Sequence, residues 1–296
     1  MSSNGRLHLS YILESPQQYG CWRDFRQDVE AVAQCGYEGI ELQMLTPDDF
    51  GGSDFTRLLD DCGVRLAGIQ TGSAYLVSGT CLGSPDAAVR QAATDLLKRY
   101  IDCVAPFQSV IVFGLLQGSR KDEPDRQRAL ERILTHLSEL AAYAQAAGVI
   151  MAMEPVNRYE CSVFHNTVAD VLSSVESVSS PALRGMVDTF HVNIEEAGQQ
   201  QAIYAAAPVL SHVHLSETNR GLLGTGHLDF GSVFSALHDV NYTGFVSVGV
   251  YRDDPSVAER ARHAAEQLQN VRSANGRNSS VDARKTEAWA DRPFAG

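Results

Sequence analysis

The chain has 296 residues, 44% of them hydrophobic, which is enough to fill one sizeable core, and its formal net charge is −12 at pH 7. The overall field of so acidic a protein does not attract phosphate backbones or anionic lipid, which argues against a nucleic-acid or membrane-surface role. The sequence shows neither a bilayer-spanning apolar run of about 20 residues nor a signal peptide, so we expect a cytoplasmic protein.

Eight short apolar runs alternate with longer amphipathic segments, and we expect the eight runs to be strands. They cover residues 7–13, 39–43, 66–70, 110–115, 149–154, 185–188, 211–215 and 245–250. Strand–helix alternation repeated eight times predicts a parallel sheet. No run is followed by a G-x-G-x-x-G or Walker loop, so the pattern favours a single-domain (β/α)₈ TIM barrel, in the α/β class, over an open doubly wound sheet.

The segments between these runs have the periodicity of amphipathic helices. Two long helices are expected at 85–107 and 125–147. Ser84 followed by Pro85 predicts the start of the first, and Gly148 predicts the end of the second. Shorter helices are expected at 22–35, 56–62, 168–174, 201–206, 230–240 and 256–271.

The composition changes after the last expected helix. We expect the barrel to cover residues 1–272 and the polar segment 273–296 to be a flexible tail. An alternative is an arm that docks on a neighbouring subunit through Trp289 and Phe294. The six cysteines form no C-x-x-C pair and are expected to be reduced thiols.

Three consecutive expected strands each end in one metal-capable side chain, at Glu154, Asp188 and His214. Barrel chemistry lies where the strands end, and about one strand–helix unit separates each pair, so the three should be neighbours at one rim. Two carboxylates and one imidazole suit Mn²⁺ first, with Mg²⁺ or Co²⁺ as alternatives, better than a closed zinc site. His212, two residues before His214, is expected deeper in the barrel.

Each of these residues also has a purely structural interpretation. Glu154 alone could pair with Arg158, and Asp188 alone could cap a following helix. His214 alone could be a hydrogen-bonded core histidine. Their joint occurrence at matched strand ends favours the metal site.

Several segments together resemble the xylose isomerase-like TIM barrels, and among them the ketose 3-epimerases that act on tagatose or psicose. They are GYEGIEL, MEPVNRYE, VDTFHVNIEE, HVHLSETNR followed by GTGHLDF, and NYTGFVSVGVY. The resemblance covers about residues 7–270 and is strongest over 150–250. It implies a metal-dependent sugar isomerase or epimerase that removes a proton next to a carbonyl, with a small-molecule sugar or glycoside as substrate and a homo-oligomeric assembly.

The resemblance also assigns roles to residues. It implies that Glu154, Asp188 and His214 bind the metal. It further implies that Glu160, His191 and Arg220 bind the substrate, the first two near the reacting carbon and Arg220 on the carbonyl side. Glu154 is our candidate for the base, and His191 is the second candidate catalytic residue.

The chain departs from the family pattern on the eighth strand. There the family has a second glutamate, which binds the metal and serves the opposite face of the sugar, and this sequence has Gly249. Glu217 and Glu41 are the candidate substitutes from other strands.

Gly249 leaves three functions open. The first is the isomerase or epimerase. The second is a lyase or deglycosylase that eliminates a group from a 3-keto glycoside, because one base suffices and Gly249 would open room for an aglycone. The third is a non-catalytic sugar-binding barrel. No basic cluster is expected at the rim, which favours an unphosphorylated substrate.

Overall fold

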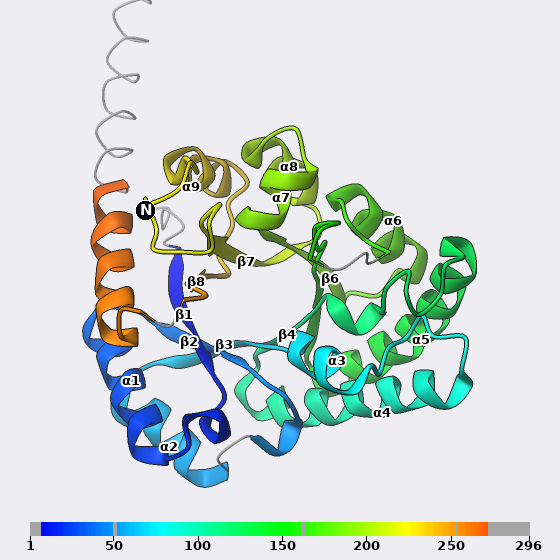
Figure 1. Cartoon of the computed structure of the whole chain (residues 1–296), viewed down its shortest axis with the longest axis horizontal. Helices are drawn as coiled ribbons and strands as arrows, with labels where there is room; N and C mark the ends of the chain where they lie inside the picture. Colours follow the sequence, from blue (N-terminus) through cyan, green and yellow to red (C-terminus); the bar gives the residue numbers. More distant parts are fainter. Residues whose placement is uncertain (1–6, 50–51, 161–163, 253, 272–296) are drawn as a thin grey trace, which may run out of the picture.

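Figure 1 shows the computed structural model of the chain, which describes residues 7–49, 52–160, 164–252 and 254–271. The predicted tail, with Trp289 and Phe294, lies outside the described residues, as does Cys161. The proposed boundary at residue 272 therefore stays a prediction. Among the described helices, none combines the length and apolar character needed to cross a bilayer.

Eight parallel strands form a closed barrel in which each strand pairs with its sequence neighbours and β1 pairs with β8. This confirms the predicted (β/α)₈ barrel, and each predicted strand overlaps the observed one. The strands are β1 His8–Glu14, β2 Gly39–Gln43, β3 Arg65–Gln70, β4 Val110–Phe113, β5 Ile150–Met153, β6 Leu183–Asp188, β7 Leu210–Ser216 and β8 Phe245–Gly249.

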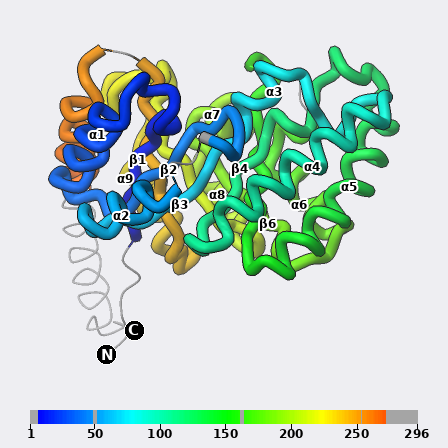
Figure 2. Tube along the Cα trace, turned by 90° about the horizontal axis from the view of Figure 1, so that it is seen from below, coloured from blue at the N-terminus to red at the C-terminus, as the bar shows by residue number. Residues whose placement is uncertain are grey.

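Helices surround the barrel, and the last described helix, 257–271, lies beside α1 (Figures 1 and 2). The other α-helices are α1 Trp22–Gln34, α2 Gly52–Cys62, α3 Gly72–Ser78, α4 Ala87–Val104, α5 Arg126–Ala147, α6 Val168–Val178, α7 Thr189–Glu195, α8 Gln199–Ala206 and α9 Phe230–Asp239. Short 3₁₀ turns cover Pro16–Tyr19, Pro47–Asp49, Ala105–Phe107 and Leu115–Gln117. Neither α3 nor α7 was among the predicted helices.

The ends of the two longest helices test the predicted caps. Gly148 ends α5 with φ +69°, the left-handed conformation predicted for it. Ser84 is not the cap of α4, so that prediction was wrong. Asp86 caps the helix by accepting a hydrogen bond from the Ala88 amide at 2.8 Å, because its backbone is extended and its carboxylate reaches the first turn.

Apolar side chains form one large core between the strands and the helices and a small one inside the barrel. The small one is built by Val112, Ala152 and Met186 on β4, β5 and β6. The opposite half of the barrel interior is polar. Its buried side chains, on β1, β2, β7 and β8, are Ser10, Glu41, His212, His214 and Ser247. A polar interior of this kind is stable only when its groups are hydrogen-bonded to one another.

Candidate metal centre and active site

The three predicted metal ligands come together at the carboxyl ends of β5, β6 and β7. Nδ1 of His214 lies 3.6 Å from Oε1 of Glu154 and 3.9 Å from Oδ2 of Asp188. Asp188 and His214 are register partners on adjacent strands, which explains their proximity. Oxygen and nitrogen are the ligand atoms that a small divalent ion takes, and both carboxylates lie within 3.9 Å of the His214 nitrogen. The residues present therefore fit a divalent metal.

A second histidine faces the same carboxylates, because Nε2 of His191 lies 3.8 Å from both Glu154 Oε1 and Asp188 Oδ2. Its other nitrogen, Nδ1, accepts hydrogen bonds from the backbone amide of Asn157 at 3.3 Å and from Nδ2 of Asn157 at 2.8 Å. Because Nδ1 accepts these bonds, Nε2 carries the ring hydrogen. His191 thus presents a donor to the site, which suits a substrate oxygen better than a cation.

In His214 the other ring nitrogen, Nδ1, faces the carboxylates Glu154 and Asp188, and Nε2 points away from them. Its Nε2 lies 2.8 Å from Oε1 of Glu41, whose other oxygen lies 2.6 Å from Nε2 of His212. The carboxylate accepts the hydrogen from Nε2, so Nδ1, which faces Glu154 and Asp188, is the nitrogen that can bind a metal. A carboxylate behind a metal-binding imidazole commonly fixes the ring in this way.

The buried Glu41–histidine cluster is stabilised by charge. Burial alone would raise the pKa of Glu41, but His214 and His212 outweigh it and hold that pKa well below its usual value. Burial opposes a charged His214 as well, yet the carboxylate of Glu41 and the hydrogen bonds to Glu154 and Glu41 raise the pKa of His214 well above its usual value. The carboxylate of Glu41 and the two histidine rings therefore stabilise one another electrostatically inside the barrel.

The two candidate substitutes for the missing glutamate lie elsewhere. Glu41 contacts the edge of the His214 ring that faces away from Glu154 and Asp188. Glu217 accepts hydrogen bonds from the amides of Thr218 at 2.6 Å and Gly224 at 3.2 Å, and so shapes the loop after β7. Neither supplies a fourth ligand in this arrangement.

Asp188 serves two purposes at once. Its Oδ1 accepts a hydrogen bond from the Phe190 amide at 2.8 Å and caps α7, as the structural interpretation expects. Its Oδ2 faces the site and accepts a hydrogen bond from Nη1 of Arg220 at 3.1 Å. Burial would raise the pKa of Asp188, but the charge of Arg220 and the two nearby histidines outweighs it and lowers the pKa.

Arg220 holds the other substrate candidates together. Its Nη2 donates to Oε1 of Glu160 at 3.0 Å and lies 3.3 Å from Nε2 of His191. The guanidinium lies between two aromatic rings, 4.0 Å from the ring centre of Phe190 and 4.6 Å from that of Tyr251. Such stacking fixes a planar cation in one orientation. Glu160, His191 and Arg220 therefore meet beside the candidate metal ligands.

Tyr251 fills the space beside Gly249. A Cβ atom at position 249 would lie 2.8 Å from the Tyr251 ring and 2.9 Å from Oγ of Ser216. Tyr251 therefore occupies the room beside Gly249 that was expected to take an aglycone, while the absence of a second carboxylate, the other feature that favoured a lyase, remains. Tyr251 was also missed as a site residue, because only the folded loop after β8 brings its ring back over the barrel mouth.

A cavity of about 420 Å³, here called the site cavity, adjoins these groups and has the size of a small-molecule site. The residues that line it include Gln43, Gln70, Glu154, Glu160, Asp188, His191, Arg220 and Tyr251. All three predicted substrate-binding residues are among them. Gln43 and Gln70, at the ends of β2 and β3, were not predicted as site residues.

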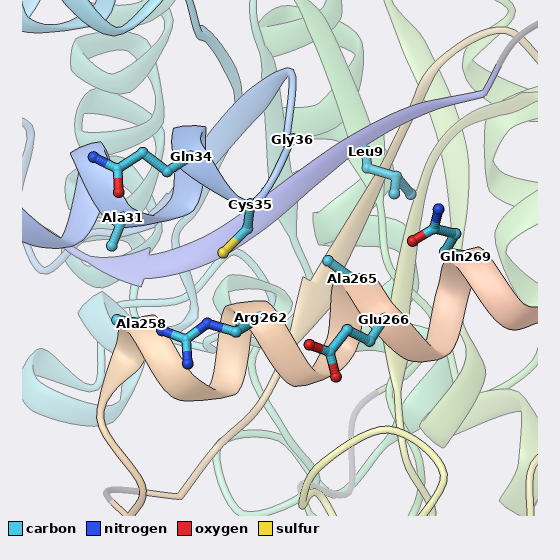
Figure 3. Close-up of a pocket in the computed structure, with 10 residues that line it drawn as sticks. All are labelled: Leu9, Ala31, Gln34, Cys35, Gly36, Ala258, Arg262, Ala265, Glu266 and Gln269. Atoms are coloured by element: carbon cyan, nitrogen blue, oxygen red, sulfur yellow. The ribbon is translucent and has the colours of Figure 1, made fainter.

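A larger cavity, of about 860 Å³, lies outside the barrel between α1 and helix 257–271 (Figure 3). Its polar lining includes Cys35, Arg262 and Glu266, and it contains none of the candidate metal ligands. Burial raises the pKa of the Cys35 thiol, which makes it a weak nucleophile at neutral pH. Size alone therefore does not identify the functional site.

Comparison with known proteins gives consistent matches. Residues 29–273 match the family model described as xylose isomerase-like TIM barrel. A ketose 3-epimerase of Arthrobacter globiformis is 31% identical over 221 residues, which cover 74% of this chain and 75% of that protein. An L-ribulose 3-epimerase of Mesorhizobium japonicum is 34% identical over 212 residues, or 71% of this chain and 69% of that protein. The crystal structure of a D-allulose 3-epimerase from Methylomonas sp. in complex with D-allulose superimposes with a TM-score of 0.77 and 26% identity, covering 90% of this chain and 98% of that one.

Proposed function

Because this chain belongs to the xylose isomerase-like TIM barrel family and is an isomerase- or epimerase-type sugar enzyme, we propose that it acts on a ketose by metal-dependent removal of a proton next to the carbonyl. The relatives' named substrates, ketoses, L-ribulose and D-allulose, support a ketose. The observation that carries the proposal is the convergence of Glu154 and Asp188 on Nδ1 of His214, within 3.9 Å, beside a cavity lined by hydrogen-bonding groups.

Glu154, Asp188 and His214 would hold one divalent ion, and Mn²⁺, Mg²⁺ and Co²⁺ all suit this donor set. When bound, such an ion supplies a Lewis acid that stabilises negative charge developing beside a carbonyl. Glu41 keeps the His214 ring oriented for that task through its hydrogen bond to Nε2.

The remaining residues orient the sugar and move the proton. Glu154 is the carboxylate that takes the proton from the carbon next to the carbonyl, as a positioned general base. Nε2 of His191 and Nη2 of Arg220, whose nitrogen atoms lie 3.3 Å apart, form a pair of donors for oxygens of the reacting end. Glu160, which pairs with Arg220, accepts a hydrogen bond from a neighbouring hydroxyl.

The face to which the proton returns decides the product. If Glu154 returns the proton on the face from which it took it, the substrate is regenerated, or the proton goes to the neighbouring carbon and the carbonyl moves. If the proton returns to the opposite face of the same carbon, the product is an epimer. Gly249 provides no carboxylate for the opposite face. The Tyr251 hydroxyl, 3.1 Å from where a side chain at 249 would begin, is our candidate donor there.

Solvent exchange tests this proposal. Metal-stripped protein is incubated in D₂O with a panel of ketoses that includes L-ribulose and D-allulose, with and without added Mn²⁺, and the sugars are examined by NMR. We expect deuterium at a carbon next to the carbonyl only when Mn²⁺ is present. The absence of exchange with every ketose, in protein shown to bind Mn²⁺, would contradict the proposal and favour a non-catalytic sugar-binding barrel.

A further inference from the structure

One side-chain nitrogen on the wall of the site cavity is buried without a hydrogen-bond partner in the described part of the chain. Nε2 of Gln70, the last residue of β3, makes no hydrogen bond within the part of the chain that the structure describes, and Gln70 lines the site cavity. Leaving a buried donor unpaired destabilises a folded protein, because the group loses its hydrogen bonds to water and gains none. Such a group at a ligand cavity indicates that the ligand supplies the missing acceptor.

The strand geometry directs Gln70 into the barrel mouth. A Cβ atom at Gly68 would lie 3.3 Å from the side chain of Glu41, which is inside the barrel. Side chains two residues apart on a strand share a face, so Gln70 points to the same side, one layer nearer the mouth. Gln43 is the register partner of Gln70 on β2 and also lines the site cavity.

These two carboxamides face the reacting groups across the barrel. In a closed barrel of eight strands, β3 lies four strands from β7, which carries His214 and leads into Arg220. A sugar whose carbonyl lay beside His214 would therefore extend its other end toward β2 and β3.

We propose that Gln70, with Gln43 beside it, binds hydroxyl groups at the end of the sugar remote from the reacting carbon and so determines which ketose is accepted. This inference rests on the proposed function. A carboxamide both donates and accepts hydrogen bonds, which matches a hydroxyl group and is a poor match for a phosphate. Among the described residues lining the site cavity, the one lysine or arginine is Arg220, and Asp188 and Glu160 already engage it.

Gln70→Leu separates this role from a structural one. With Mn²⁺ present, the affinity for D-allulose and L-ribulose is measured by calorimetry, together with the Tm of the sugar-free protein. We expect sugar affinity to fall about tenfold while Tm stays equal or rises, because the variant removes an unpaired donor. A purely structural glutamine would instead lower Tm. Gln127→Leu, on the exposed face of α5, is the matched control and should change neither quantity.

Deoxy sugars give a second measurement that does not depend on how well the variant folds. The wild-type protein should bind the 5-deoxy or the 6-deoxy ketohexose about tenfold more weakly than the parent sugar, and Gln70→Leu should show no such difference. Equal affinity of wild type and variant for every sugar would overturn this inference alone. A wild-type protein that binds Mn²⁺ but no ketose would overturn the proposed function, and this inference with it.

Discussion

Glu41 shows how one residue links the barrel interior to the site. Its carboxylate joins the rings of His212 and His214, from which it is separated by 171 and 173 residues in sequence. Gly68, on the neighbouring strand, leaves room for it, since a Cβ there would contact the carboxylate. Orientation of His214 thus depends on a residue that never reaches the site cavity.

The environment of Gly249 leads to a stability prediction. Gly249→Ala should lower the free energy of unfolding by about 1–3 kcal/mol, because the new methyl group overlaps the Tyr251 ring. The measurement is urea denaturation. In a protein that already carries Tyr251→Ala, adding Gly249→Ala should lower the free energy of unfolding much less than it does in the wild type. If Gly249→Ala is as stable as the wild type, Tyr251 does not occupy this space.

The sequence predicted part of this residue-scale picture. Spacing of about one strand–helix unit placed Glu154, Asp188 and His214 on successive strand ends, and the structure brings them together, although their metal role stays a prediction. Glu41 could not be assigned, because its contact with His214 exists only after the barrel closes. The place of the Tyr251 ring depends on the path of the loop after β8, which local patterns do not determine.

At the scale of elements, the connection between β5 and α6 is anchored by a buried histidine. His165 contacts Oε1 of Gln117 through Nδ1 and Oγ of Ser174 through Nε2, the latter at 2.6 Å. Burial lowers the pKa of His165 to about 4. Gln117 in turn lies beside the backbone of Glu154, so this packing supports the strand end that carries the candidate base.

This histidine predicts a pH dependence of stability. The pKa of His165 is lower in the folded than in the unfolded protein. Its stabilising contribution to the free energy of unfolding is therefore complete above about pH 6.5 and is lost as the pH falls toward 4. Between pH 7 and pH 5 it amounts to about 2 kcal/mol. By urea denaturation, the free energy of unfolding of the wild type should fall between pH 7 and pH 5. In His165→Asn that fall should be smaller by about this amount. His238→Asn, at an exposed site on α9, serves as the control. Equal losses in wild type and His165→Asn would refute the assignment.

Element prediction succeeded where a pattern is long enough to repeat. The long helices α4 and α5 show several turns of 3.6-residue periodicity, and the buried strands are continuous apolar runs. The short helices α3 and α7 have seven residues each, slightly fewer than two full turns, which is too short to display a 3.6-residue period. For α7 the signal is local instead, because Asp188 caps its first turn through the Phe190 amide.

For the whole molecule, the division of the barrel interior determines where chemistry can occur. The half under β4, β5 and β6 contains the apolar cluster of Val112, Ala152 and Met186, while the half built by β1, β2, β7 and β8 contains the Glu41–histidine cluster. The candidate metal ligands lie above the boundary between the two. Alternation of strands and helices predicted this architecture, but the fold does not select the sugar, and the homo-oligomeric assembly stays a prediction.

The decisive property of the whole protein is the proposed binding of a divalent metal by Asp188 and His214. Metal-stripped protein is titrated with Mn²⁺ by calorimetry, together with Asp188→Ala, His214→Ala and the surface control Asp239→Ala. We expect one Mn²⁺ per chain in the wild type and the control, and at least a hundredfold weaker binding in the other two variants. A wild type that binds no Mn²⁺, or folded Asp188 and His214 variants that bind it as tightly as the wild type, would contradict the account.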